Sequence, residues 1–281
     1  MPKISVAMSP SKFGDYQTCP MQFYYKHVEK IASPMNGAAW LGSSCHHAVE
    51  EGIKFMHKNE LPESQKKSII EEYTVSQFAE KFDHPTDFSG NEIEIDWKED
   101  SPEKLRAKGL QMCSAYVYDP CFDTIKVKAI EEWVPLYVIE ANDTFISVPE
   151  LMPDQLTRTF RQRVDCILEN DTIQDFKTSG ASWDVSKVID RLQFDMYAIA
   201  YRKQFAIPND QPVYIRCDVI VKTKDIKIQS FIVSKTYKDE LRVLKYLKKM
   251  NDAIEAGMFY PTPNALCNNY CAYKDLCRGT Q

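Results

Sequence analysis

The sequence lacks any long apolar run: no stretch approaches the roughly twenty apolar residues that a membrane-spanning helix needs. The first residues, MPKISVAMSPSKFGDYQTC, contain no secretory apolar segment either. Internal repeats and low-complexity segments are missing as well. We therefore expect an intracellular, cytoplasmic protein that makes no contact with a membrane.

Positive charge is also scarce. The chain has 35 Lys and Arg against 40 Asp and Glu, a formal net charge of −5. A protein that coats nucleic acid without specificity is strongly basic, so this class is disfavoured. A local basic groove remains compatible with the overall charge.

What the chain does contain is apolar residues and cysteine. Hydrophobic residues make up 44% of its 281 residues, enough for a sizeable core in one large domain or two small ones. Its nine cysteines do not suggest a disulfide framework, because intracellular thiols stay reduced and a chain of this size needs no staples. They are therefore buried thiols or metal ligands.

Three of these cysteines lie close together near the C-terminus. The segment ALCNNYCAYKDLC, residues 265–277, carries Cys267, Cys271 and Cys277. A tetrahedral metal site or an iron–sulfur cluster takes four protein ligands. The spacing therefore indicates a metal site whose fourth ligand lies elsewhere in the chain.

The spacing of apolar residues predicts helices first and strands later. Helical spacing occurs at 9–30, with a Cys-Pro interruption, and at 42–58, 62–82 and 102–119, and a polar surface loop is expected at 84–101. Strand patterns follow at 125–140, 160–169, 172–179, 212–222 and 226–234, with helices at 184–205 and 236–257. This order predicts an α/β fold, a mixed sheet flanked by helices, with a helical N-terminal subdomain.

The segment RVDCILENDTIQDFKTS predicts a β-hairpin with a defined register. A three-residue turn made by END, in which Asn170 or Asp171 adopts the left-handed conformation, pairs residues whose numbers sum to 340. Asp165 then faces Asp175. Lys177 shares the face of Asp175, because side chains two apart in a strand point the same way.

Two carboxylates that face each other repel, so this pair needs a proton or a cation. Lys177 supplies part of the charge, and a divalent ion held by oxygen ligands could supply the rest. Such a site fits metal-assisted hydrolysis of a phosphodiester, in which the metal binds phosphate and acidifies water while the lysine positions or deprotonates that water. The alternative is a solvated hairpin face with a surface salt bridge, which a lone D…DxK pattern does not exclude.

Five motifs resemble those of one nuclease family, and they occur in the same order. They are S-P-S-K-F-x-x-Y-x-x-C-P-x-x-F-x-Y at 9–25, G-S-S-C-H at 42–46, Asp165 with Asp175-Phe176-Lys177, Gln193-x-x-x-Tyr197, and C-x₃-C-x₅-C at 267–277. The sequence thus resembles RecB-family nucleases of the PD-(D/E)XK superfamily, particularly the iron–sulfur branch of AddB nuclease domains and CRISPR-associated RecB-like exonucleases. It departs from that family at Gln162, where glycine is usual, and in the longer first gap of the cysteine trio.

The resemblance implies a role for each matching residue. It implies that Mg²⁺ or Mn²⁺ is held by His46, Asp165, Asp175 and the backbone carbonyl of Phe176. It also implies that Lys177 activates or positions water and that Gln193 and Tyr197 contact the active site or DNA. From helical spacing, Glu50 shares a face with His46 and is expected to orient its imidazole.

The resemblance also names the missing cysteine ligand. A 4Fe–4S cluster would be held by Cys19, Cys267, Cys271 and Cys277, joining the two ends of the chain. The implied architecture is one restriction-endonuclease-like domain over 1–281, with a helical part at 1–123, an α/β nuclease core at 124–257 and a cysteine clamp at 258–281. Zinc in place of the cluster, in a structural protein without a DNA role, remains an alternative.

The expected function is metal-dependent DNA hydrolysis. By the resemblance, the enzyme is an exonuclease on single-stranded DNA or DNA ends, in recombination, repair or phage or CRISPR-type processing. The chain has no G-x-x-x-x-G-K-[ST] motif, so any unwinding would come from a helicase, recombination or CRISPR partner. The rival hypothesis is a non-catalytic or weakly catalytic DNA-binding subunit of a larger recombination or spacer-acquisition complex.

Overall fold

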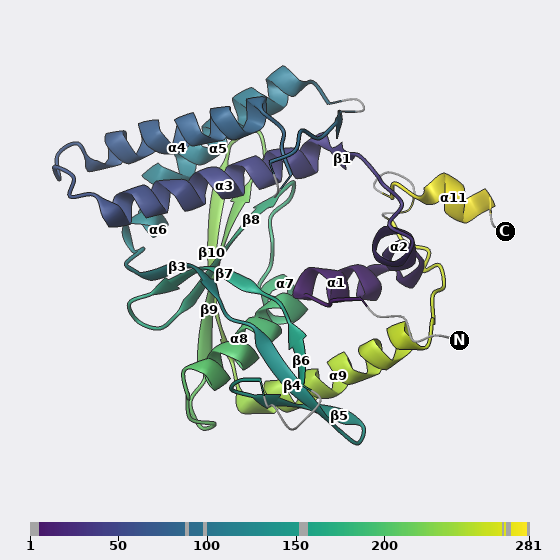
Figure 1. The fold of residues 1–281 in the computed structure, drawn as a ribbon. Helices are drawn as coiled ribbons and strands as arrows, with labels where there is room; N and C mark the ends of the chain where they lie inside the picture. Colours follow the sequence, from purple (N-terminus) through teal and green to yellow (C-terminus); the bar gives the residue numbers. More distant parts are fainter. Residues whose placement is uncertain are drawn as a thin grey trace.

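The structure, a computed structural model, describes residues 6–87, 90–97, 100–151, 157–265, 267 and 271–279. Its centre is a five-stranded sheet with the order β10-β9-β8-β7-β3. These strands span Lys227–Lys235, Val213–Val221, Ile173–Ser179, Arg163–Leu168 and Val127–Trp133. Strands β8 and β9 are parallel and the other neighbouring pairs are antiparallel. The expected α/β fold with a mixed sheet flanked by helices is confirmed (Figure 1).

Three helices cover one face of this sheet: α3 (Gly37–Lys58), α4 (Lys66–Asp83) and α5 (Pro102–Tyr118). Figure 1 shows them grouped together above the sheet. Their apolar side chains, among them Trp40, Phe78 and Met112, form a core with Phe176 of β8. The short pair β1 (Met35–Asn36) and β2 (Ile95–Asp96) and the helix α6 (Pro120–Asp123) flank these helices.

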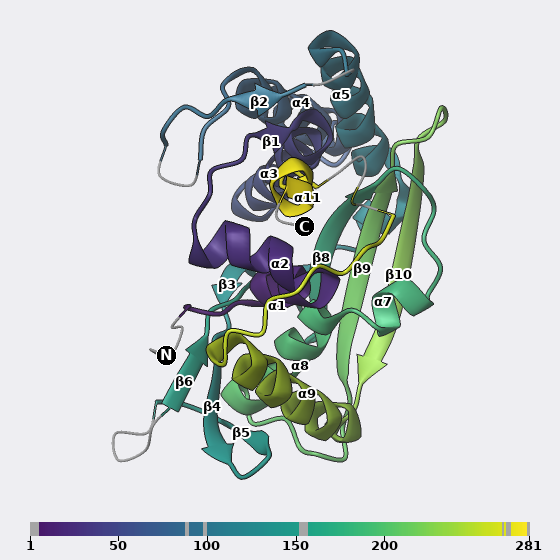
Figure 2. The ribbon, with the colours of Figure 1, turned by 90° about the vertical axis from the view of Figure 1, so that its right-hand side faces the viewer.

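The opposite face is covered by α1 (Pro10–Thr18), α8 (Leu192–Gln204) and α9 (Tyr237–Glu255) (Figure 2). Phe13, Tyr197 and Leu247 from these helices belong to a second core that includes Val219 of β9. The predicted interruption at Cys19 is present: α1 ends before it, and α2 (Pro20–Phe23) and a π-helical turn (Tyr24–Val28) follow. The remaining helices are α7 (Ser186–Ile189) and α11 (Lys274–Gly279).

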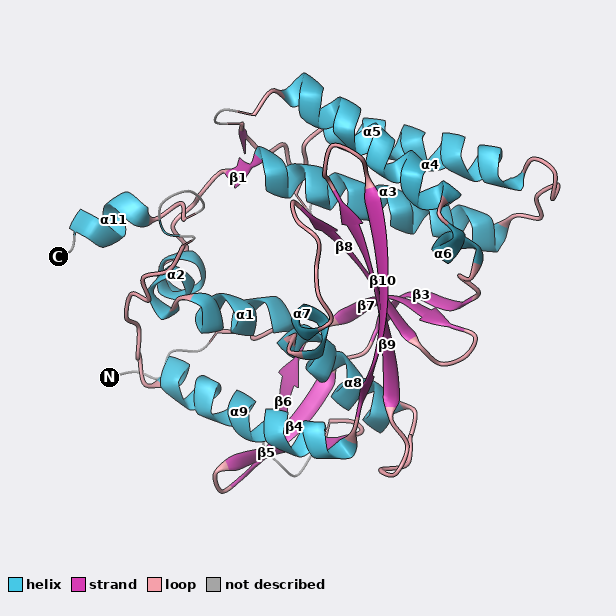
Figure 3. Ribbon diagram, turned by 180° about the vertical axis from the view of Figure 1, so that it is seen from behind, coloured by secondary structure: helices cyan, strands magenta, loops and turns pink. Residues whose placement is uncertain are grey.

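A second sheet, with the order β5-β4-β6, packs against α9. Its strands are β4 (Leu136–Ala141), β5 (Thr144–Val148) and β6 (Thr157–Phe160). The strand patterns predicted at 125–140 and 160–169 are present, and each divides between the two sheets (Figure 3). Pro135, which has no N–H to donate, separates β3 from β4, and Arg161 and Gln162 separate β6 from β7.

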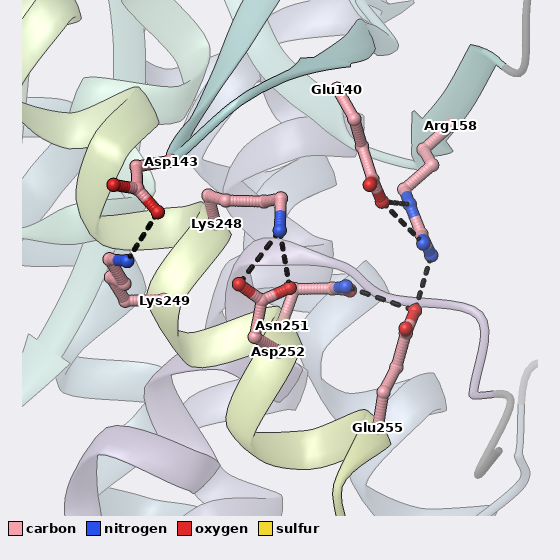
Figure 4. Close-up of polar contacts among 8 residues, drawn as sticks. All are labelled: Glu140, Asp143, Arg158, Lys248, Lys249, Asn251, Asp252 and Glu255. Carbon is pink, nitrogen blue, oxygen red and sulfur yellow. Dashed lines mark hydrogen bonds and ion pairs between the residues drawn. The ribbon is translucent and has the colours of Figure 1, made fainter.

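Ion pairs attach α9 to this second sheet (Figure 4). Arg158 of β6 contacts Glu140 of β4 at 2.6 Å and Glu255 of α9 at 2.5 Å. Asn251 donates a hydrogen bond to the same Glu255 carboxylate at 3.0 Å. Lys249 pairs with Asp143 in the β4–β5 turn at 3.1 Å. These contacts orient the helix relative to the sheet, and burial of its apolar face holds it there.

Helix ends differ from the predicted ranges where capping or irregular backbone intervenes. Helix α3 begins at Gly37 rather than 42, because the Asn36 side chain accepts the Ala39 N–H at 2.8 Å. The helix predicted at 184–205 is divided into α7 and α8 around Asp190. The surface loop predicted at 84–101 contains the short strand β2, and its residues 88–89 and 98–99 lie outside the described residues. In the part of the chain that the structure describes, no helix is both long and apolar enough to cross a bilayer.

The packing of α4 on α5 depends on a glycine. A Cβ added at Gly109 would lie 1.9 Å from the ring of Phe78, which is fully buried. Gly109→Ala should therefore lower the free energy of unfolding by about 1–3 kcal/mol, measured by urea denaturation. Gly14→Ala in α1 is the matched control, because nothing lies within 4 Å of its added Cβ. The control should be neutral or stabilising by up to about 1 kcal/mol. Equal stability of the two variants would contradict the close approach.

Candidate active site

The β7–β8 hairpin has the predicted register near its turn. Cys166 pairs with Gln174 and Ile167 with Ile173, and the Leu168 N–H donates to the Thr172 carbonyl at 2.9 Å. Asp171 is the left-handed residue of the turn, with φ of 61°. The sum of 340 is thus confirmed for these pairs. The antiparallel ladder stops at Cys166 and Gln174, one pair before Asp165 and Asp175 would meet.

Beyond this pair, an aspartate side chain of β7 makes the hydrogen bond to β8 in place of the backbone. Asp165 accepts the backbone N–H of Phe176 through its Oδ2 at 2.9 Å. On its other edge β8 pairs in parallel with β9 along its whole length, and this pairing places Asp175 beside Cys217. Asp175 Oδ2 lies 2.6 Å from Lys177 Nζ, as expected from their shared face. The two strands therefore diverge where their carboxylates lie, and the site is built in the opening between them.

Helix α3 brings His46 to this opening. The His46 Nε2 lies 3.3 Å from Asp165 Oδ1. The imidazole ring packs edge-on against the Phe176 ring, with 6.2 Å between the two ring centres. One turn earlier, a Cβ at Gly42 would lie 2.8 Å from the Thr178 hydroxyl of β8. Glycine at this position therefore lets the helix approach the strand closely enough for the histidine to reach the acid.

Burial and neighbouring charges shift the pKa values of His46, Asp165 and Asp175 in different ways. Burial by itself would lower the pKa of His46, but the charge and hydrogen bond of Asp165 outweigh it and raise that pKa. Burial would raise the pKa of Asp165, and His46 and Lys177 reverse this and lower it. Burial raises the pKa of Asp175, with only partial compensation from Lys177. The raised pKa of His46 and the lowered pKa of Asp165 both favour an ion pair between them, whereas the raised pKa of Asp175 disfavours its charge.

The Asp175 carboxylate has an unusual environment. It is completely buried, and among the described residues neither oxygen forms a hydrogen bond of good geometry, although Oδ2 lies 2.6 Å from Lys177 Nζ. A buried acceptor without a hydrogen bond costs about 1–3 kcal/mol, and more when charged. Carboxylate oxygens are ligands preferred by Mg²⁺ and Mn²⁺, and imidazole also binds divalent metals. The donor set of Asp165, Asp175 and His46 therefore fits a divalent cation in kind.

Helix α8 supplies the other wall. Gln193 donates through Nε2 to the Tyr197 hydroxyl at 2.7 Å, so the predicted i, i+4 pair is a hydrogen-bonded pair. Tyr197 is almost fully buried, and burial raises its pKa well above the usual value, with further contributions from Asp175 and Asp165. The tyrosine therefore packs in the core while its hydroxyl accepts the hydrogen bond from Gln193.

A groove of about 1130 Å³ opens onto the site. It is lined by residues of α3, β8 and the segments before α3 and after α4, including His46, Phe176 and Lys177. This volume slightly exceeds the range of about 300–1,000 Å³ that is usual for ligand sites. The groove gives an extended substrate access to Lys177.

Sequence reasoning missed a second charged cluster in the groove. Arg163 of β7 contacts Glu131 of β3 at 2.7 Å and lies 4.0 Å from Glu50 of α3. Lys54 pairs with Glu131 at 2.5 Å. Arg163 could have been found from its place two residues before Asp165, on the same strand face. Glu131 has a φ of 54°, and neither this conformation nor its strand pairing is readable from the sequence.

Glu50 belongs to this cluster rather than acting through His46. Among the described residues, no hydrogen bond joins its carboxyl to the imidazole, and its Oε1 is buried without a hydrogen bond. Burial, with a further contribution from Glu131, raises the pKa of Glu50 to about 7. The expected orienting role therefore lacks the contact that it requires.

The other face of β8 is anchored by a buried polar network. Asp218 of β9 accepts hydrogen bonds from Gln174 and from the Tyr116 hydroxyl of α5, both at 2.7 Å. Arg216 pairs with Asp218 at 2.8 Å. Gln174 directly precedes Asp175, so this network fixes the strand on the face opposite to the Asp175 side chain.

The cysteine segment returns to the N-terminal helices. The Met21 N–H donates to the Tyr260 carbonyl at 3.1 Å, and the Asn264 amide donates to the Thr18 carbonyl at 3.3 Å. Cys19 Sγ accepts the Thr262 N–H at 3.4 Å. The second view of the ribbon shows the chain after α9 passing alongside α1 and α2 (Figure 2). The two ends of the chain are therefore in contact, as the clamp requires.

The four predicted cysteine ligands are brought to this contact. Burial raises the pKa of Cys277, and the neighbouring Cys19, Cys271 and Cys267 contribute to the shift. Residues 266, 268–270 and 280–281 of the predicted clamp lie outside the described residues. Within the described part of the chain, no group of three or more His, Cys, Asp or Glu is arranged to hold a metal ion, here or at the acids.

One comparison with known proteins identifies a family. A family model of the PD-(D/E)XK nuclease superfamily matches residues 7–278. The crystal structure of a "Putative exonuclease" from Eubacterium rectale is similar over 98% of this chain and 88% of that chain, with a TM-score of 0.50 and 12% identity. At this identity the similarity concerns the fold alone. A structure of SSO0001 covers 96% of both chains at 13% identity, but its TM-score of 0.38 supports no argument. No curated protein matches the sequence.

Glu50 should make stability depend on pH. Its pKa is about 7 in the folded protein against an ordinary value of 4.5, so the folded state binds the proton more tightly. The resulting stabilisation is complete below pH 4.5 and is lost as the pH rises through about 7. Glu50→Gln should therefore gain stability relative to wild type between pH 5 and pH 8, by up to roughly 3 kcal/mol.

Urea denaturation in EDTA at the two pH values measures this difference. Glu72→Gln, an exposed position on α4, is the matched control and should show no such pH-dependent gain. A Glu50→Gln effect that is the same at pH 5 and pH 8 would contradict the raised pKa.

Proposed function

This chain belongs to the PD-(D/E)XK nuclease superfamily, and on that premise we propose that it is a divalent-metal-dependent deoxyribonuclease. The α/β fold with its mixed sheet is consistent with the restriction-endonuclease-like fold of that superfamily. PD-(D/E)XK nucleases generally use divalent metals such as Mg²⁺ or Mn²⁺. We further propose that the chain forms one nuclease domain, with the helical, α/β and cysteine-rich parts expected from its sequence.

One observation carries the proposal: the buried Asp175 carboxylate lies 2.6 Å from Lys177, at the point where Asp165 interrupts the strand ladder. A purely structural Asp–Lys pair would be more stable with complete hydrogen bonds or as an apolar pair. The pair instead shares the site with a second carboxylate, that of Asp165, and Lys177 lines a groove of about 1130 Å³. These features support hydrolysis at this position.

The proposed roles follow from these positions. Asp165, Asp175, His46 and the Phe176 carbonyl would hold the divalent ion, which when bound screens charge on the phosphate and lowers the pKa of water. Lys177 would orient the attacking water as an ammonium group, or accept the proton of that water as a neutral amine. Its contact with Asp175 holds the ammonium group beside the metal ligands.

Gln193 and Tyr197 would act on the substrate side of α8. The hydrogen bond between them fixes the Gln193 amide, which is partly exposed, while Tyr197 is held in the core. We propose that Gln193 orients Lys177 or a DNA group. Tyr197 would position the glutamine and lie close to the acids.

We propose single-stranded DNA or DNA ends as the substrate, cut exonucleolytically. This follows from the resemblance to RecB-like exonucleases and agrees with the exonuclease name of the structural neighbour from Eubacterium rectale. A helicase or a recombination or CRISPR protein would present such ends. The long groove suits an extended strand.

Asp175→Ala should abolish the hydrolysis of DNA, because it removes a metal ligand and the partner of Lys177. Lys177→Ala should reduce the rate by about 10²–10⁴, the range for loss of a positioned acid or base. The assay uses 5′- and 3′-labelled single-stranded, duplex and circular DNA with Mg²⁺ or Mn²⁺. Release of mononucleotides or short products from linear DNA, with circles intact, is the result expected of an exonuclease.

Asp143→Ala is the matched control, since this exposed aspartate lies in the β4–β5 turn and pairs with Lys249 (Figure 4). It should retain full activity. Degradation by Asp175→Ala at the wild-type rate would overturn the nuclease site and favour the DNA-binding subunit.

We also propose that Cys19, Cys267, Cys271 and Cys277 hold an iron–sulfur cluster of the 4Fe–4S type. Two backbone N–H groups support this proposal, because Thr262 donates to Cys19 Sγ and Asn264 to Cys267 Sγ, both at 3.4 Å. Hydrogen bonds to sulfur stabilise cysteine thiolates and tune such clusters. The cluster would join the chain ends and has no proposed part in hydrolysis.

Cys19→Ala should lose bound iron as completely as Cys277→Ala, because both supply one of four ligands. Iron content and broad absorbance near roughly 400 nm of anaerobically purified protein measure this loss, since Zn²⁺ is colourless. Cys121→Ala, a partly exposed cysteine on α6, is the control that should keep the iron. Colourless wild-type protein that contains zinc would refute the cluster, and iron that survives Cys19→Ala would refute Cys19 as a ligand.

A further inference from the structure

Arg191 lies between α7 and α8, at the start of the helix that carries Gln193 and Tyr197. Its guanidinium carbon is 5.2 Å from the ring centre of Trp183 and 5.9 Å from that of Phe194. Such stacking is favourable for arginine and restricts its side chain to few conformations. The guanidinium is therefore held in place before any substrate arrives.

The polar contacts of Arg191 use little of its hydrogen-bonding capacity. Its Nε donates to the Gln193 Oε1 at 3.4 Å, and this is its one side-chain hydrogen bond among the described residues. No carboxylate within those residues forms an ion pair with it. In contrast, ion pairs with carboxylates are made by Arg106, Arg158, Arg163, Arg202, Arg216 and Arg242. Its terminal N–H groups thus remain as donors to an anion.

Arg191 is linked to the acidic site through α8. Gln193 accepts the Arg191 Nε–H at 3.4 Å and donates to the Tyr197 hydroxyl at 2.7 Å. Tyr197 belongs to the same buried core as Cys217, which is the β9 partner of Asp175. Because paired residues of neighbouring strands point to the same face of a sheet, Asp175 and α8 lie on one face. Arg191 therefore lies on the α8 side of the site.

We propose that Arg191 binds a backbone phosphate of the DNA strand that is cut. A guanidinium with free terminal N–H groups matches the oxygens of a phosphodiester and can donate two parallel hydrogen bonds. Trp183 and Phe194 fix the plane of the group, which reduces the entropy lost on binding. The link to Gln193 couples this contact to the proposed catalytic side of α8. This inference rests on the proposed nuclease function.

DNA binding by catalytically inactive protein tests the contact directly. The parent variant is Asp175→Ala in EDTA, and anisotropy of a labelled single-stranded oligonucleotide is measured at several salt concentrations. Adding Arg191→Ala should weaken binding by roughly tenfold. It should also reduce the slope of log K against log salt by about 0.7, the value for one lost phosphate contact on a single strand.

Conservative and control variants separate charge from structure. Arg191→Lys should keep the salt slope but bind more weakly, because an ammonium cannot form the paired hydrogen bonds. Arg242→Ala removes an arginine with a 68% exposed side chain from α9 and should leave the slope unchanged. Gln193→Ala should slow cleavage in otherwise wild-type protein without changing the slope of the inactive parent.

An unchanged salt slope for Arg191→Ala would overturn the proposal and leave Arg191 as a residue that only positions Gln193. Should Arg191→Ala fail to fold, judged by thermal unfolding, Arg191→Gln is measured in its place and the same slope decides. The active enzyme distinguishes this failure from failure of the nuclease itself. Loss of cleavage by Asp175→Ala with an unchanged Arg191→Ala slope keeps the nuclease and rejects the phosphate contact.

Discussion

The buried carboxylate of Asp175 is the constraint on which the site depends. A charged group that is out of water and poorly hydrogen-bonded is unfavourable, so the surrounding structure must hold it in place. The polar network of Asp218, Gln174 and Tyr116 does so from the opposite face of β8. That network and the two apolar cores thus hold the acid at the position where we propose that a cation binds.

The divergence of β7 and β8 converts this constraint into a site. Where the next pair of the ladder would lie, the Asp165 side chain accepts the hydrogen bond of the Phe176 N–H. This buried backbone donor is therefore paired. The same carboxylate then pairs with His46 through its other oxygen. Asp165 therefore contacts strand β8 through one carboxylate oxygen and His46 through the other.

The two layers of helices contribute different chemistry. Helix α3 supplies an imidazole and, through Glu50, a proton-holding carboxyl, and its approach depends on Gly42. Helix α8 supplies an amide, a phenol and a stacked guanidinium, and Gln162 attaches it to the hairpin by donating to the Met196 carbonyl at 2.9 Å. Gln162 stands where the resemblance to RecB-family nucleases leads us to expect glycine. Its hydrogen bond gives it a structural role, because it joins the acidic hairpin to α8.

The sequence by itself determined the α/β class, the order of the motifs and the hairpin register, because these follow from local periodicity, turn residues and short spacing. It also indicated Asp175 and Lys177 as neighbours. Only the tertiary structure decided the division of two strand patterns between separate sheets, the end of the ladder before Asp165, and the places of Glu131 and Arg191. These features depend on contacts between residues far apart in the chain, whose burial and pairing leave no periodic signal in the sequence.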